Sequence, residues 1–182
     1  MRTLPPSGSP IQAGDLLACW SSSDDPVGQL STAIRERFGV KHTFFAANGR
    51  GAMTLLLTAL AQRETRPEKQ YVVLPSYTCY SVAASVLKAG LQVIICDVDP
   101  SSLAFDRTQL ESIDFDEVLA IVSANLYGIP NDLIWLESVA RRYNTYLIDD
   151  AAQCLGGTLS NRPVGTFGTA GIFSFDKGKV IT

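Results

Sequence analysis

The sequence predicts an α/β domain whose mainly parallel sheet is flanked by helices. Short runs rich in valine, isoleucine and leucine alternate with segments in which apolar residues recur at helical spacing. The runs are apolar almost throughout, which is typical of strands that helices cover on both faces. The 182 residues are 46% hydrophobic and 18% charged, a composition typical of a globular chain with one core of ordinary size.

The first helix is expected at residues 27–38, because Leu30, Ile34 and Phe38 fall on one helical face and Gly39 can end the helix. Strands are expected where the apolar runs contain β-branched residues, at 42–46, 71–74, 92–96, 118–123 and 145–148. Helices are expected between them, at 51–62, 80–89, 107–113 and 133–143. The glycine-rich stretch 156–171 should begin as a hairpin around residues 160–163 and lead into a strand at 170–174.

Charge, apolar content and cysteine spacing argue against several classes of protein. The net charge is −3 and the basic residues are scattered, whereas nucleic-acid binding needs a basic stripe. The longest apolar runs fall far short of the about 20 residues that span a bilayer, so no membrane span is expected. The first ten residues contain no apolar segment typical of a signal peptide, so a cytoplasmic location is expected. The four cysteines include no CxxC pair and there is one histidine, so no metal site is expected.

Polar residues lie at the ends of several predicted strands. Asn125 and Asp150 each follow one of these strands directly or within two residues. Ligands of parallel α/β sheets bind beyond such carboxyl ends, so a pocket is expected there. Gln153 follows Asp150, and Ser174 and Lys179 lie five positions apart near the end of the chain. A carboxylate, an amide, a hydroxyl and an amine are the groups that pyridoxal phosphate chemistry requires.

Five short motifs, in this order, make a resemblance to a known family specific. They are residues 73–78 (VLPSYT), 96–99 (CDVD), 126–128 (LYG), 147–153 (LIDDAAQ) and 173–179 (FSFDKGK). From about Phe44 to Thr182 the sequence resembles the DegT/DnrJ/StrS family of pyridoxal-phosphate-dependent sugar-nucleotide aminotransferases. The resemblance implies the PLP-dependent transferase fold type I. Residues 26–182 would be a partial cofactor-binding large domain, without its C-terminal remainder and the small domain, and residues 1–25 a flexible leader and N-terminal segment.

The resemblance implies two catalytic residues. Lys179 would form the Schiff base with the cofactor and then transfer the substrate's proton, and its spacing from Ser174 selects it over Lys177. Asp150 would keep the cofactor's ring nitrogen protonated, which the ring needs to act as an electron sink. The alternative for Asp150 is a cap of the turn after the strand. Asp149 is expected to point to the opposite face of the sheet.

The phosphate of the cofactor would bind at the start of a helix. By the resemblance, the donors are the Ser174 hydroxyl and the backbone amides of Arg50 and Gly51, aided by the helix dipole. The long side chain of Arg50 departs from the small residues that the family more often has. It would therefore either add a charged contact or obstruct the site.

The ring of the cofactor would be contacted by two further groups. Gln153 stands where family members hydrogen-bond the phenolic oxygen, although a cap of nearby backbone is the alternative. Where the family places a stacking aromatic, this chain has Cys79, followed by Tyr80. Either Tyr80 covers the ring or the smaller Cys79 does. The alternative for Tyr77 and Tyr80 is that both are ordinary packing aromatics at the rim.

The sequence therefore predicts a PLP-dependent aminotransferase that transfers an amino group from a donor such as glutamate to a nucleotide-linked keto-sugar. The full-length form is expected to be a homodimer. The alternative is a catalytically inactive fragment of such an enzyme, acting only as a binding or structural piece, because family sites take residues from chain beyond Thr182 and from a second subunit. A Rossmann-like nucleotide binder fits the alternation but requires a GxGxxG motif that the chain lacks.

Overall fold

The computed structural model describes residue 14 and residues 25–175. Several predictions concern residues outside these ranges: the greater part of the proposed leader, and the two candidate lysines Lys177 and Lys179.

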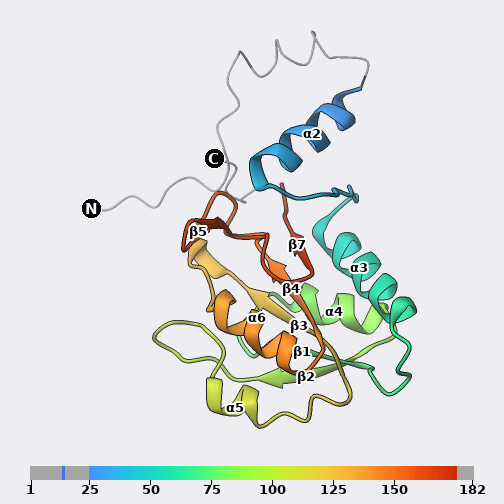
Figure 1. Ribbon diagram of the computed structural model, residues 1–182, viewed down its shortest axis with the longest axis vertical. Helices are drawn as coiled ribbons and strands as arrows, with labels where there is room; N and C mark the ends of the chain where they lie inside the picture. The colour runs from blue at the N-terminus through green and yellow to red at the C-terminus, as the bar shows by residue number, and fades with distance from the viewer. Residues whose placement is uncertain (1–13, 15–24, 176–182) are drawn as a thin grey trace.

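A five-stranded parallel sheet forms the centre of the molecule, with the strand order β2-β1-β3-β4-β7 (Figure 1). Its strands are β1 (Tyr71–Pro75), β2 (Gln92–Cys96), β3 (Val118–Ala124), β4 (Tyr146–Asp150) and β7 (Ala170–Ile172). The short strands β5 (Thr158–Leu159) and β6 (Arg162–Pro163) form a separate hairpin, with Ser160 and Asn161 at positive φ in its turn. These strands confirm the predicted parallel α/β architecture.

Capping residues mark the starts of several helices, and a glycine marks the end of one. They are α2 (Pro26–Phe38), α3 (Gly49–Arg63), α4 (Tyr80–Lys88), α5 (Arg107–Glu111) and α6 (Leu133–Arg142), with a 3-10 turn η1 at Leu126–Gly128. The Asp25 carboxylate caps α2 by accepting from the Gly28 amide at 2.9 Å, and Gly39 ends it in the left-handed conformation. Asn48 caps α3 and Asp106 caps α5 in the same way.

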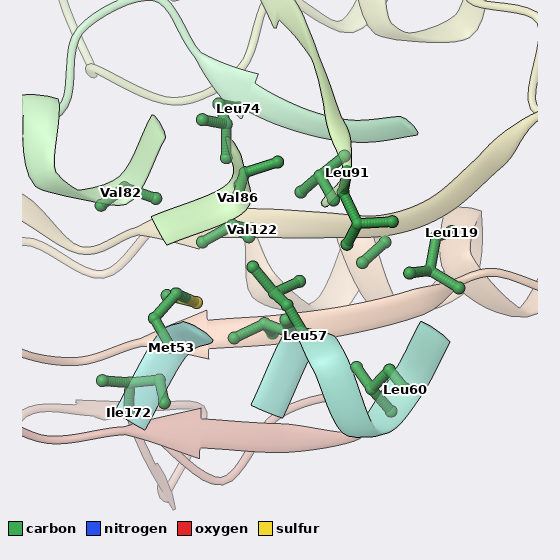
Figure 2. Packing of buried hydrophobic residues seen from close by; sticks show 13 residues of the cluster. Met53, Leu57, Leu60, Leu74, Val82, Val86, Leu91, Leu119, Val122 and Ile172 are labelled. Carbon is green, nitrogen blue, oxygen red and sulfur yellow. The ribbon is translucent and has the colours of Figure 1, made fainter. Parts of the chain in front are cut away.

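Helices pack on both faces of the sheet, which explains why its strands are apolar throughout. On one face, Met53, Leu57 and Leu60 of α3 and Val82 and Val86 of α4 pack against the strands (Figure 2). On the other face, α5 and α6 cover a second cluster that includes Val73, Ile121 and Leu147. Successive residues such as Val72 and Val73, or Leu147 and Ile148, thus enter different halves of the core, as the alternation of side chains along a strand predicts.

The predicted strand at 42–46 is wrong. Residues 42–46 pair with no strand, and the Phe44 side chain is 91% exposed. The segment instead runs beside α2, where Ser31 and Thr43 share a hydrogen bond of 2.5 Å between their hydroxyls. Its two phenylalanines imitate a strand pattern, but no sheet edge accepts their backbone. The last strand is also shorter than predicted, since β7 ends at Ile172.

Replacing Leu57 with alanine should lower the free energy of unfolding by about 2–5 kcal/mol, because the side chain is fully buried between α3 and the sheet. Leu55→Ala is the matched control on the same helix: its side chain is 66% exposed, and the change should stay within about 0.5 kcal/mol. Urea unfolding followed by circular dichroism measures both. Equal losses at the two positions would contradict the described packing of α3.

Candidate active site

A cleft of about 290 Å³ lies at the carboxyl ends of the strands. The starts of two helices and the ends of three strands contribute its walls. The lining residues are Asn48, Gly49, Arg50, Met53, Thr78, Cys79, Tyr80, Ser81, Val82, Ser85, Ala124, Asn125, Leu126, Asp150, Ala152, Gln153, Ile172 and Ser174. Six of the seven residues predicted for the site fall within the described chain, and five of these six, all but Gly51, line this cleft.

The two neighbouring aspartates at the end of β4 have different surroundings. Asp150 lines the cleft, is partly buried, and accepts a hydrogen bond from the Ala152 amide at 3.0 Å. Asp149 is 0% exposed and does not line the cleft. The structure therefore places the two carboxylates as predicted, one toward the cleft and one away from it.

Buried Asp149 is surrounded by hydrogen-bond donors. Its Oδ1 accepts from Asn125 Nδ2 at 2.7 Å, and its Oδ2 accepts from the amides of Gly165 at 2.6 Å and Phe167 at 3.2 Å. Burial raises the pKa of the Asp149 carboxyl, and the donated hydrogen bonds act in the opposite direction. The sequence pointed to the orientation of Asp149 but not to these partners.

The start of α3 meets Ser174 at one end of the cleft. A Cβ added to Gly49 would lie 3.8 Å from Ser174 Cβ and 3.9 Å from its Oγ, so the first residue of α3 and Ser174 are in van der Waals range of each other. The amides of Gly49 and Arg50 have no acceptor inside the helix, because they belong to its first turn. A hydroxyl and two amides without acceptors in the helix therefore lie at the same end of the cleft, and such groups can bind an anion.

The Gly51 amide is placed differently from the prediction. It donates to Asn48 Oδ1 at 2.8 Å, as the cap of the helix. Gly51 therefore stabilises the start of α3 in this structure, and Gly49 takes its place beside Arg50 in the cleft wall. The AsnGlyArgGly sequence could have signalled this, since asparagine is a preferred N-cap residue.

Arg50 is the one cationic side chain among the described residues that line the cleft. Its side chain is exposed and makes no ion pair within residues 25–175. Its carbonyl oxygen accepts from the hydroxyl of Ser85, which is buried and also donates to the Ser81 carbonyl at 2.8 Å. Ser85, which the sequence did not single out, thus ties α4 to the first turn of α3.

Gln153, Cys79 and Tyr80 also line the cleft, and they come from segments other than α3. Gln153 Oε1 accepts from the Tyr127 amide at 3.3 Å, so the side-chain oxygen is engaged and the amide nitrogen keeps its donors. Cys79 and Tyr80 form the first turn of α4 and both are exposed. The structure brings both to the cleft, and the choice between them as ring cover stays a prediction.

The family model that describes the DegT/DnrJ/EryC1/StrS aminotransferase family matches residues 16–182. The chain belongs to this family. The match confirms the resemblance drawn from the five motifs, and the cofactor of the family's aminotransferases is pyridoxal phosphate.

Curated relatives and solved structures agree with this membership. The chain is 34% identical over 167 residues to GDP-perosamine synthase of Caulobacter vibrioides, covering 90% of this chain and 43% of the relative. It is 33% identical over 150 residues to a UDP-N-acetyl-3-dehydro-alpha-D-glucosamine 3-aminotransferase of Acidithiobacillus ferrooxidans, covering 82% of this chain and 40% of the relative. The structure of DesI with its TDP-sugar product superposes with a TM-score of 0.81 at 25% identity, covering 95% and 45% of the two chains.

The chain spans about 40% of the length of the curated relatives it matches. Within the residues that the structure describes, no helix is long and apolar enough to cross a membrane. The same part of the chain holds no cluster of histidine, cysteine, aspartate or glutamate that could bind a metal ion.

The cysteines should differ sharply in reactivity. Burial, with smaller effects of Asp106 and Asp97, raises the pKa of Cys96 to about 12, so its thiol stays protonated at pH 8. Burial likewise raises the pKa of Cys154, whereas Cys79 is exposed at the cleft. Iodoacetamide at pH 8 followed by peptide mapping should label Cys79 and leave the two buried thiols unmodified. Urea-unfolded protein, in which all four cysteines of the chain react, is the control. Rapid native labelling of Cys96 would contradict its burial.

Proposed function

We propose that the chain forms the cofactor-binding part of a PLP-dependent aminotransferase that acts on a nucleotide-linked keto-sugar, with an amino-acid donor such as glutamate. The main support is the meeting of Asp150, Ser174 and the start of α3 in one cleft. These groups lie far apart in the sequence and come together only through the parallel sheet. Membership of the family gives this combination of groups its chemical meaning.

The described residues fit pyridoxal phosphate at both of its polar ends. The Ser174 hydroxyl and the amides of Gly49 and Arg50 would hold a phosphate, and Gly49 brings no side chain into the space beside Ser174. Asp150 is the one carboxylate in the cleft wall among the described residues, and it would hold a proton on the ring nitrogen. When bound, the cofactor supplies an electron sink for the carbon that loses a proton.

Other residues of the cleft would orient and cover the ring. Gln153 keeps amide donors available, and Tyr80 and Cys79 stand at the cleft mouth. Lys179 would provide the amine that binds the cofactor and moves the substrate's proton, a role that rests on the resemblance of residues 173–179 to the family's pattern. The division into residues 1–25 and a partial large domain at 26–182 belongs to the same proposal.

Nucleotide-linked sugars are proposed as substrates because the relatives point to them. GDP, UDP and TDP sugars each occur in the names or title of the similar proteins described above. The exposed Arg50 side chain offers a charge for a phosphate-bearing ligand at the cleft. The homodimer, the glutamate donor and the cytoplasmic location stay predictions.

The first test is cofactor binding by the purified chain. Titration with pyridoxal phosphate should produce a saturable absorbance band distinct from that of the free cofactor. Borohydride reduction and peptide mapping should then place the label on Lys179. Label on Lys177, or spread over surface lysines, would overturn the assignment of Lys179.

Replacing Asp150 with asparagine should slow the absorbance change that L-glutamate causes in the loaded protein by at least about 100-fold, because an amide cannot hold the ring proton. Asp116→Asn, an exposed carboxylate far from the cleft lining, is the matched control and should leave the rate unchanged. Saturable binding without any response to glutamate in the unmodified chain would favour the alternative of a piece that binds without catalysing.

A further inference from the structure

We propose that Asp149 is a positioning residue that holds the phosphate-binding end of the cleft in place, acting through the turn at residues 165–167 and strand β7. The inference rests on the proposed function, since it assigns a role toward the same phosphate. Asp149 is a fully buried carboxylate that the proposed chemistry does not use. A charge in such a place needs compensating partners, and the identity of those partners indicates what it does.

One carboxylate oxygen holds the turn that precedes β7. Asp149 Oδ2 accepts from the amides of Gly165 and Phe167, at 2.6 Å and 3.2 Å. The chain then enters β7 at Ala170 and reaches Ser174 two residues after the strand ends. The carboxylate therefore fixes the point from which the chain leads to the cleft.

The turn packs directly on β7, so a movement of the turn would also move this strand. A Cβ on Gly171 would lie 1.8 Å from the Gly165 carbonyl oxygen, which means that the two backbones touch. Gly165 has φ +89°, and a Cβ there would lie 2.2 Å from the Phe173 ring. A shift of the turn would therefore displace Gly171 and Phe173, and with them the adjoining Ser174.

The other carboxylate oxygen connects the turn to the strand ends. Asn125 Nδ2 donates to Asp149 Oδ1 at 2.7 Å and to the Asp150 carbonyl at 2.8 Å, and its Oδ1 accepts from the Asn131 amide at 2.9 Å. Asn125 is itself buried. One buried pair thus ties the ends of β3 and β4 to the turn that supports Ser174.

The hydrogen-bond pattern requires a carboxylate at position 149 and an amide at 125. All three partners of Asp149 donate, whereas an asparagine side chain has one acceptor oxygen and one donor nitrogen. In Asp149→Asn the new NH₂ group would face either Asn125 Nδ2 or the two backbone amides. In both orientations a donor faces a donor, and at least one hydrogen bond is lost. The double variant Asp149→Asn with Asn125→Asp restores a matched donor and acceptor between the two side chains. The Asp150 carbonyl loses the side-chain donor of Asn125 but still accepts from the backbone amide of residue 125, at 3.2 Å in this structure.

The test compares pyridoxal phosphate with pyridoxal, which lacks the phosphate. Equilibrium binding to the unmodified chain, Asp149→Asn and the exchanged double variant gives the Kd of each ligand. Asp149→Asn should weaken binding of pyridoxal phosphate by about tenfold, equal to about 1.4 kcal/mol, and that of pyridoxal by less than about twofold. The double variant should recover most of the preference for the phosphorylated ligand, and Asp116→Asn should change neither Kd.

Hydrogen–deuterium exchange without ligand gives an independent readout. In Asp149→Asn, residues 164–174 should exchange faster while the segment of α3 around Leu57 does not change. If the unmodified chain binds no pyridoxal phosphate, the proposed function of this chain fails, and the exchange result alone decides whether Asp149 holds the turn. Equal loss of both ligands, or unchanged exchange at 164–174, would overturn the inference. If Asp149→Asn does not fold, a folded double variant that lacks the phosphate preference overturns it, and one that retains the preference supports it.

Discussion

The parallel register of β3 and β4 is the constraint on which the cleft depends. Ser123 pairs with Asp149 and Ala124 with Asp150, at the last positions of the two strands. Side chains alternate between the faces of a sheet, so a slip of one residue would exchange the surroundings of the two aspartates. The apolar residues before them resist such a slip, because Leu147 and Ile148 belong to different halves of the core. Packing in the core of the sheet thereby decides which carboxylate reaches the cleft.

The two aspartates carry the same chemical group, but they differ in burial and in hydrogen-bond partners. Asp149 has exchanged water for three protein donors, and burial still raises the pKa of its carboxyl. Its carboxylate accepts hydrogen bonds from neutral amides, and two of these amides belong to the turn before β7. Asp150 keeps its side chain in the cleft wall, where a cationic ligand can approach it. In the proposed function, Asp149 supports the site and Asp150 contacts the ligand.

Much of this arrangement could be predicted from the sequence, because the spacing of apolar residues indicates where strands lie and which face each side chain takes. The strand runs located β1 to β4 within two residues, and alternation along β4 separated Asp149 from Asp150. The failures have local causes. Residues 42–46 imitate a strand although no neighbouring backbone pairs with them, and the Gly51 amide was assigned to phosphate although Asn48 caps it. The partners of Asp149 could not be foreseen, since Gly165 and Phe167 reach it only after the turn folds back on the sheet.

The contact between Gly165 and Gly171 has a consequence for engineering this site. The strand that leads to Ser174 packs main chain on main chain against the preceding turn, and a side chain at either glycine would meet neighbouring atoms at 1.8–2.2 Å. A library that varies this end would consist largely of misfolded proteins. Arg50 and Tyr80 carry exposed side chains at the cleft, and substitutions at these positions would leave the core packing unchanged. Attempts to change ligand preference should therefore vary the side chains of Arg50 and Tyr80 and leave Gly49 and the glycine contact untouched.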